Sequence, residues 1–367
     1  MPGAAAHARP AACFENLFFQ EVSVNCSPSS SIADPLQHWC IDRLSSLLEP
    51  APTHVSFRAL AGDASSRSYF RAHVAGQKSF IVAYVPPESQ SCRSFVDIAR
   101  TWHTYGIRTP HVHSVDMQRG FMLLEDFGDV QLYSVLSDNN VANFYSSALH
   151  LLHTVQGLPL SSMPRLPRYD QTLLRSELEL FGHWFVDKML GIETCEQQAT
   201  WLASLYDDLI ASAVQQPQVP VHRDYHSRNI MVLPEGLGLL DFQDCVLGPI
   251  MYDPVSLLKD CYIEWPASDI YKWMQEFADK SPFLAQADSA QIKRWFDLLG
   301  AQRHLKVLGI FARLWLRDGN SHYLNDIPRV YRYLSHFFEQ YNQWQEVSAW
   351  LKTQILPALQ QQPWWRE

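Results

Sequence analysis

The chain has no long apolar run, no excess of positive charge and no paired cysteine spacing, and each absence excludes a class of protein. No stretch reaches the roughly eighteen apolar residues of a membrane-spanning helix. The chain also lacks the basic segment followed by an apolar one that would predict a signal peptide. The formal net charge is -9, which argues against a general nucleic-acid or membrane-surface binder because those proteins need clustered positive charge. Seven cysteines without paired spacing favour reduced thiols, and therefore a cytoplasmic location.

What is present is the composition of an ordinary globular protein. The chain has 367 residues, 47% hydrophobic and 18% charged, which is enough for two lobes. Residues 1–37 are rich in Ala, Ser and Pro without a sustained period, so we predict a disordered leader. An opening helix is predicted from Pro35 to Leu48, and short strands are predicted at 55–60, 68–74, 78–85 and 120–125.

The most informative stretch is HRDYHSRN at 222–229, followed by DFQD at 241–244. Phosphoryl transfer from a nucleotide needs a base at the acceptor hydroxyl and oxygen ligands for the metal on the phosphates. Asp224 is the predicted base. Asn229, five residues later, and Asp241 are the predicted Mg²⁺ ligands, because this ion prefers hard oxygen donors.

A predicted hairpin explains how Asp241 returns to this loop. The apolar runs 230–232 and 237–240 flank Pro234-Glu235-Gly236, which is typical of a turn between two strands. The alternative is a surface loop and hairpin whose Asp and Asn residues are only turn formers. His222 is predicted to bind the loop backbone instead of acting in the chemistry.

Several motifs together resemble the aminoglycoside phosphotransferase and choline kinase superfamily. They are HRDYHSRN, LLDFQD, GPIMYDPVSLLKDCYIEWP, GDASSRSYFR, FMLLEDFGD, SELELFGHWF and ARLWLRDGNSHYLNDIPRVYRYL, spread over about residues 38–340. Within the superfamily they look most like the N-acetylmuramate/N-acetylglucosamine anomeric kinases of cell-wall recycling. The resemblance implies an α+β, bilobal protein-kinase-like fold. A small β-rich nucleotide-binding lobe is expected at 38–126, and a larger, mainly helical catalytic and substrate lobe at 127–367.

The resemblance also implies ATP and Mg²⁺ as cofactors and a sugar as acceptor, in peptidoglycan recycling. Neither a nucleic acid nor a membrane is an expected partner, and we expect a monomer. In this chain, the loop of small residues at 61–67, which includes Ser65, matches the position of the phosphate-covering loop of the superfamily. The third predicted strand lacks the lysine that most kinases place there. Arg67 or Arg71 is the predicted substitute at the nucleotide phosphates, unless both lie on a solvated strand edge.

Further site residues are predicted around the acceptor. The resemblance places Glu125 at the hinge between the lobes, where the backbone binds adenine. Glu177 and Trp184 lie off the apolar stripe of their helix and are candidates for lining a sugar pocket, although surface residues have the same pattern. Predicted substrate-binding residues in the catalytic motifs are Arg223, Gln243 and Asp244.

A basic stripe suggests an anionic substrate. Arg303, Lys306, Arg313 and Arg317 share one helix face, and basic residues outnumber acidic ones by eight to three between 293 and 332. A solvated charged face is the ordinary explanation. If the stripe faces the cleft, Arg313 and Arg317 bind a carboxylate such as the lactyl group of N-acetylmuramate.

Three alternatives remain open at this stage. A kinase of another small alcohol, such as an amino alcohol or an aminoglycoside, shares every catalytic feature. A regulatory pseudokinase is favoured only by the missing strand lysine, since Asp224, Asn229 and Asp241 are all present. A structural interaction module predicts no metal-dependent nucleotide binding.

Overall fold

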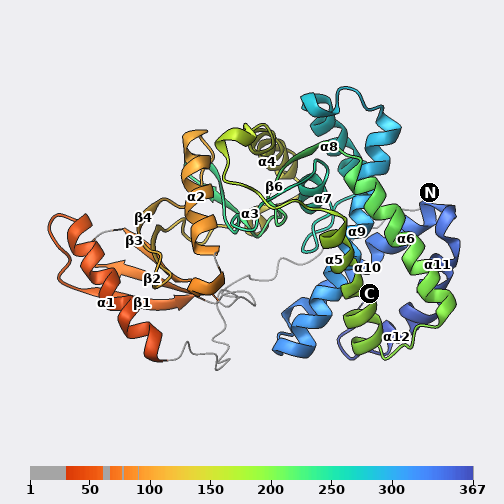
Figure 1. Cartoon of the computed structure of the whole chain (residues 1–367), viewed down its shortest axis with the longest axis horizontal. Coiled ribbons are helices and arrows are strands. Elements are labelled where there is room, and N and C mark those ends of the chain that lie inside the picture. Colours follow the sequence, from red (N-terminus) through yellow and green to blue (C-terminus); the bar gives the residue numbers. More distant parts are fainter. Residues whose placement is uncertain (1–29, 61–66, 77, 90, 367) are drawn as a thin grey trace, which may run out of the picture.

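A five-stranded antiparallel sheet organises the N-terminal part of the computed structural model, which describes residues 30–60, 67–76, 78–89 and 91–366. Four of its strands lie where the sequence predicts them, and the sheet occupies the left of Figure 1. The fourth strand is short and half-buried throughout, so its sequence carries no clear alternation. The strand order is β1-β2-β3-β5-β4, with β1 Val55–Leu60, β2 Ser68–Val74, β3 Ser79–Tyr84, β4 Val112–Asp116 and β5 Phe121–Glu125.

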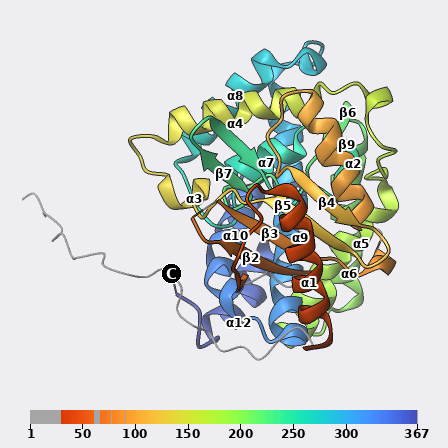
Figure 2. The same ribbon diagram turned by 90° about the vertical axis from the view of Figure 1, so that its left-hand side faces the viewer.

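The two faces of this sheet are covered by different helices, because successive side chains of a strand point to opposite faces. Leu123 of β5 packs in a small core with α1 (Ser30–Leu47), which lies across the near side of the sheet in Figure 2. Its neighbour Leu124 packs with α2 (Ser91–Thr104) in the main core that continues into the C-terminal part. The sheet is therefore joined to the rest of the chain through one face only.

The start of α1 corrects part of the predicted leader. The helix begins at Ser30, before the predicted Pro35, so residues 30–37 are helical and not a disordered segment. Leu36 is fully buried against the sheet, a tertiary contact that the Ala, Ser and Pro composition does not reveal. Residues 1–29 lie outside the described residues, and the rest of the leader prediction lies there with them.

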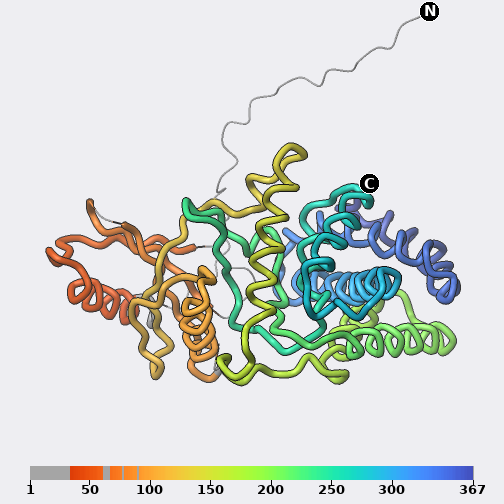
Figure 3. The backbone as a smooth tube through the Cα atoms, turned by 90° about the horizontal axis from the view of Figure 1, so that it is seen from above, coloured from red at the N-terminus to blue at the C-terminus, as the bar shows by residue number. Residues whose placement is uncertain are grey.

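The C-terminal part is mainly helical and is built around the 30-residue helix α9 (Ser289–Asp318), as Figures 1 and 3 show. Every residue from Trp295 to Gly309 is buried, so this helix is surrounded on all sides. A Cβ atom on Gly309 would lie 2.4 Å from the carbonyl carbon of Leu180, so glycine is needed for the close approach of α5. The other helices are α3 (Leu132–Val135), α4 (Val141–Gln156), α5 (Gln171–Leu180), the π-helix η3 (Phe181–Met189), α6 (Glu196–Val214), α7 (Tyr252–Leu258), α8 (Ala267–Lys280) and α10 (Ile327–Gln340).

The predicted catalytic hairpin is confirmed, and a second strand pair encloses it. β7 (Ile230–Leu233) pairs antiparallel with β8 (Gly236–Leu239), which ends two residues before Asp241. Outside this hairpin, β6 (Gln218–Val221) pairs antiparallel with β9 (Val246–Pro249). The two nested pairs bring both ends of the catalytic stretch to the same place.

The C-terminal tail also folds, which its Gln- and Trp-rich composition does not predict. The helices α11 (Gln345–Trp350), η7 (Leu351–Ile355) and α12 (Leu356–Gln360) bury Trp344 and Trp350 against the helical core. The five cysteines among the described residues are all free, as predicted. Of the helices in the described ranges, none has the length and apolar character that a bilayer crossing requires.

Candidate active site

The loop that carries Asp224 is held by a buried carboxylate from α7. Asp253, fully buried, accepts the backbone N–H of His222 at 2.7 Å and that of Arg223 at 3.0 Å. Burial raises the pKa of Asp253 to about 7 even though it accepts these two hydrogen bonds. Arg223 has a φ of 74°, and Asp241 has a φ of 59°; no other non-glycine residue in the described ranges has a positive φ. Strain at these two positions is expected where a fold fixes a functional geometry.

Further hydrogen bonds stabilise the same loop. The Nδ1 atom of His222 accepts the N–H of Asp224 at 3.3 Å, which confirms the predicted structural role of this histidine. Asp260 accepts the backbone N–H of Ser227 at 2.9 Å and its hydroxyl at 2.6 Å. The Asn229 side-chain nitrogen donates to the carbonyl of Asp224 at 3.0 Å, so the amide oxygen is left for a ligand.

Asp241 lies beside Asn229 because the hairpin returns to the loop. The N–H of Leu240 donates to the carbonyl of Asn229 at 2.9 Å. The carboxylate of Asp241 accepts from Gln243 Nε2 at 2.7 Å and from Arg67 at 3.2 Å. One amide oxygen and one carboxylate are the donor set that Mg²⁺ accepts together with phosphates and water, so these residues fit the implied ion.

Opposing effects set the ionisation of Asp224. Its half-buried position raises the pKa, but the charges of Arg303 and Lys306 on α9 outweigh this and lower the pKa to about 2. Arg303 also donates to the carbonyl of Arg223 at 2.9 Å, so it orients the loop as well as balancing its charge. Asp224 is therefore a carboxylate at any physiological pH.

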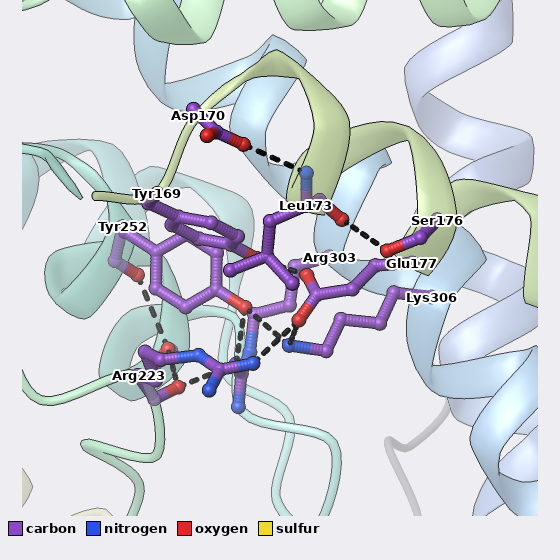
Figure 4. Close-up of polar contacts among 10 residues, drawn as sticks. Tyr169, Asp170, Leu173, Ser176, Glu177, Arg223, Tyr252, Arg303 and Lys306 are labelled. Atoms are coloured by element: carbon purple, nitrogen blue, oxygen red, sulfur yellow. Dashed lines mark hydrogen bonds and ion pairs between the residues drawn. The ribbon is translucent and has the colours of Figure 1, made fainter. Parts of the chain in front are cut away.

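A buried cluster lies behind the loop that carries Asp224 (Figure 4). Glu177 of α5 binds Arg223 at 2.5 Å and Lys306 at 2.9 Å, and it accepts a hydrogen bond from the hydroxyl of Tyr169. Lys306 also donates to the hydroxyl of Tyr252 at 3.0 Å. Burial raises the pKa of Glu177, but Lys306 and Arg223 reverse the shift and hold it below its usual value. Glu177, a candidate for lining a sugar pocket, is thus bound to two cations beside the loop.

The two candidate arginines, Arg67 just before β2 and Arg71 within it, have different partners. Arg67 contacts Asp241 and Asp244 at 3.2 Å each, which places its guanidinium at the predicted metal site. Arg71 instead binds Asp129 at 2.8 Å and Asp126 at 3.0 Å, joining the sheet to the segment that follows β5. Arg71 is therefore engaged at the hinge and not at DFQD. Ser65 lies outside the described residues.

This difference predicts opposite results for two alanine variants. We expect Arg67→Ala to raise the KM for ATP and to slow transfer, because it removes the cation beside the predicted metal site. Arg71→Ala should leave the KM for ATP nearly unchanged, yet lower stability by about 3–5 kcal/mol because the buried Asp126 carboxylate loses its ion-pair partner. Steady-state kinetics and thermal unfolding of the two variants measure both effects. Near-wild-type ATP kinetics for Arg67→Ala would refute its role at the phosphates.

The remaining predicted residues are not gathered at the loop. The side chain of Glu125 binds Arg108 at 2.8 Å and serves as a structural ion pair, and its backbone lies in the β3–β5 ladder. Trp184 is half-buried on η3, packed against the main core. Arg313 and Arg317 lie ten and fourteen residues beyond Arg303 on α9, which is about 15 and 21 Å along the helix axis. Arg317 is bound to Asp318 at 2.7 Å.

Gln243 and Asp244 do lie at the site. Gln243 is buried, and its Nε2 donates to Asp241 and, at 3.0 Å, to Asp244. Together with Arg67, it holds the two carboxylates of DFQD side by side. Asp253 and Asp260 have positioning roles that were not predicted, although both lie in the motif GPIMYDPVSLLKDCYIEWP. Both act on backbone N–H groups some thirty residues away, so no local sequence signal identifies them.

Comparison with known proteins identifies the family of the chain. Residues 56–304 match the phosphotransferase enzyme family, and the chain belongs to that family. The N-acetylmuramate/N-acetylglucosamine kinase of Pseudomonas putida is 40% identical over 284 residues, covering 76% of this chain and 83% of that protein. The enzyme of the same name from Pseudomonas aeruginosa is 38% identical over 278 residues, covering 75% and 81%.

Solved structures establish the fold. An ADP-bound aminoglycoside phosphotransferase APH(2'')-Ib superposes with a TM-score of 0.56 at 12% identity, covering 84% of this chain and 99% of that one. An ethanolamine kinase of Plasmodium vivax superposes with a TM-score of 0.57 at 12% identity, covering 83% and 88%. The predicted α+β, protein-kinase-like fold is confirmed.

Proposed function

We propose that the chain transfers the γ-phosphoryl group of ATP to the anomeric hydroxyl of N-acetylmuramate and of N-acetylglucosamine. The observation that carries this proposal is the loop and hairpin that hold Asp224, Asn229 and Asp241 together. The names of the relatives that are 38–40% identical support the choice of acceptor. The proposal places the enzyme in peptidoglycan recycling in the cytoplasm, as a monomer.

Asp224 acts on the acceptor hydroxyl. A carboxylate with a pKa of about 2 is a weak base, so it orients the hydroxyl and accepts its proton late in the reaction. Late proton transfer suits phosphoryl transfer, whose transition state is loose and needs little assistance to the nucleophile. An anomeric hydroxyl is also more acidic than an ordinary alcohol, which reduces the demand on the base.

The nucleotide phosphates meet Asn229, Asp241 and Arg67. A bound Mg²⁺ would neutralise charge on the transferred group, with Asn229 and Asp241 as its protein ligands. Arg67 supplies the fixed positive charge that the missing strand lysine supplies in most kinases. Ser65, in the preceding loop, and the backbone near Glu125 are proposed to contact the phosphates and the adenine.

The surroundings of Asp224 favour a neutral or anionic acceptor. Three cations lie near the loop: Arg223, Arg303 and Lys306. Glu177 pairs with Arg223 and Lys306, whereas Arg303 donates to a backbone carbonyl. Because Arg303 donates to a carbonyl and not to a carboxylate, its positive charge near Asp224 disfavours a polycationic acceptor. Gln243 and Asp244 are proposed to shape the acceptor site, with Trp184 as the proposed aromatic contact for the sugar ring.

A kinase of another small alcohol is the alternative, since the ethanolamine kinase shares the fold and every catalytic feature is common to the superfamily. A coupled ATP-consumption assay across N-acetylmuramate, N-acetylglucosamine, choline, homoserine and kanamycin separates the two. We expect turnover with the two sugars only. Phosphorus NMR of the product then fixes the position of the phosphate. A C6 phosphate would contradict the anomeric assignment, and turnover with choline or kanamycin alone would replace the proposed acceptor.

A further inference from the structure

Arg228, in the catalytic loop between Asp224 and Asn229, is a cation held by aromatic rings instead of a carboxylate. Its guanidinium carbon lies 3.7 Å from the ring centroid of Tyr262 and 5.1 Å from that of Tyr133. The side chain is half-buried, and it makes no hydrogen bond or ion pair with any residue in the described ranges. Its charge is therefore fixed in position while its N–H donors remain available.

The other cations around the loop are already engaged. Arg67 binds Asp241 and Asp244, Arg223 and Lys306 bind Glu177, and Arg303 donates to the carbonyl of Arg223. Carboxylates near Arg228 are also engaged elsewhere. Asp260 accepts from Ser227, and Asp326, which feels the charge of Arg228, binds Arg329 at 2.7 Å. Within the part of the chain that the structure describes, no carboxylate forms an ion pair with Arg228.

The position of Arg228 relative to the chemistry follows from the turn that contains it. The N–H of Asn229 donates to the carbonyl of His226 at 2.9 Å, and the Asn229 side chain returns to Asp224. Four residues span at most about 14 Å even when extended, so the Cα atoms of Asp224 and Arg228 lie closer together than this in the turned loop. Tyr262 also packs on His226, with 5.2 Å between ring centroids, so the aromatic support of Arg228 belongs to the loop itself.

We propose that Arg228 binds the carboxylate of an acidic acceptor, here the lactyl group of N-acetylmuramate, and thereby determines the preference between the acidic and the neutral amino sugar. This inference rests on the proposed function. It transfers the carboxylate-binding role from Arg313 and Arg317, which lie far along α9, to a residue inside the catalytic loop. A planar guanidinium stacked on a ring keeps its edge for bidentate recognition of a carboxylate, which a flexible ammonium does not match.

The test compares kcat/KM for N-acetylmuramate and N-acetylglucosamine. Arg228→Gln is expected to lower the value for the acidic sugar about 10- to 100-fold more than that for the neutral sugar, as the loss of a charge-assisted hydrogen bond implies. Arg228→Lys should restore only part of the difference. Arg313→Gln and Arg317→Gln are the matched controls, and each should change both sugars equally.

Changing the enzyme and the substrate together tests the contact between Arg228 and the carboxylate. The methyl ester of N-acetylmuramate removes the carboxylate charge from the substrate, so the wild type should favour the acid over the ester while Arg228→Gln should treat them alike. Equal losses on both sugars in Arg228→Gln, a selective loss in Arg313→Gln, or a wild type that does not distinguish acid from ester would overturn the proposal for Arg228. Turnover of neither sugar by the wild type would overturn the proposed function and the Arg228 assignment with it.

Discussion

Asp224→Asn is expected to lower kcat by at least about two orders of magnitude while leaving nucleotide affinity nearly unchanged. The amide keeps the shape of the side chain but has no negative charge to orient the acceptor hydroxyl or to take its proton. The loop should survive the change, because His222, Asp253 and Asn229 hold the loop through its backbone. Single-turnover kinetics with the preferred sugar, together with a nucleotide-binding titration, measure the two effects separately. Wild-type turnover in this variant would remove Asp224 from the mechanism.

The pH dependence gives a second check on the same carboxylate. The folded-state pKa of Asp224 is about 2, below its ordinary value of 3.8, so its ionised form is favoured by folding. That contribution to stability is present above the ordinary value and is lost as pH falls through the folded-state pKa. Between pH 5 and 8 we therefore expect no loss of kcat from protonation of Asp224. An acid limb in that range that disappears in Asp224→Asn would contradict the predicted ionisation.

Asp241→Ala is expected to abolish Mg²⁺-dependent ATP turnover, because the one remaining proposed protein ligand, Asn229, does not hold the ion alone. The variant also leaves Arg67 beside Asp244 only, so positive charge stays at the site without the metal-binding oxygen. Titration of Mg²⁺·ATP binding and a turnover assay measure the loss. Unaffected binding and turnover would show that the metal ligand is wrongly assigned.

Asp244→Ala is the matched control for this variant. Asp244 contacts the same two side chains as Asp241, namely Arg67 and Gln243, but we do not assign it to the metal. Its removal should therefore spare Mg²⁺·ATP affinity and act mainly on the acceptor. Equal loss of Mg²⁺·ATP binding in both variants would indicate that the pair forms the metal site jointly.

Features that depend on contacts between residues close in the sequence could be predicted, and features that depend on distant residues could not. The hairpin of β7 and β8 could be predicted because its two runs and its turn lie within about ten residues of each other. The relation of Asp224, Asn229 and Asp241 follows from that local geometry. The support from Asp253 and Asp260 could not be predicted in the same way, since these residues act over some thirty residues and resemble ordinary helix and loop acids.

The basic residues of α9 also show that local sequence does not predict long-range contacts. Helical periodicity correctly places Arg303, Lys306, Arg313 and Arg317 on α9, but it does not say what packs against each turn. Arg303 and Lys306 are buried beside the catalytic loop, whereas Arg317 is exposed and bound to its neighbour Asp318. The carboxylate that selects Lys306 comes from α5, far away in the sequence.

The sequence by itself determined the phosphotransferase class and singled out Asp224, Asn229 and Asp241 as the proposed base and metal ligands, because the spacing of these residues and the turn between them are local properties of the chain. Only the tertiary structure decided which cations serve the site. Arg67, just before β2, meets Asp241 across 174 residues, while Arg71, four residues later and within β2, binds Asp126 and Asp129. Long side chains of equal charge differ only in the partners that folding brings to them, and those partners are set by packing between distant elements.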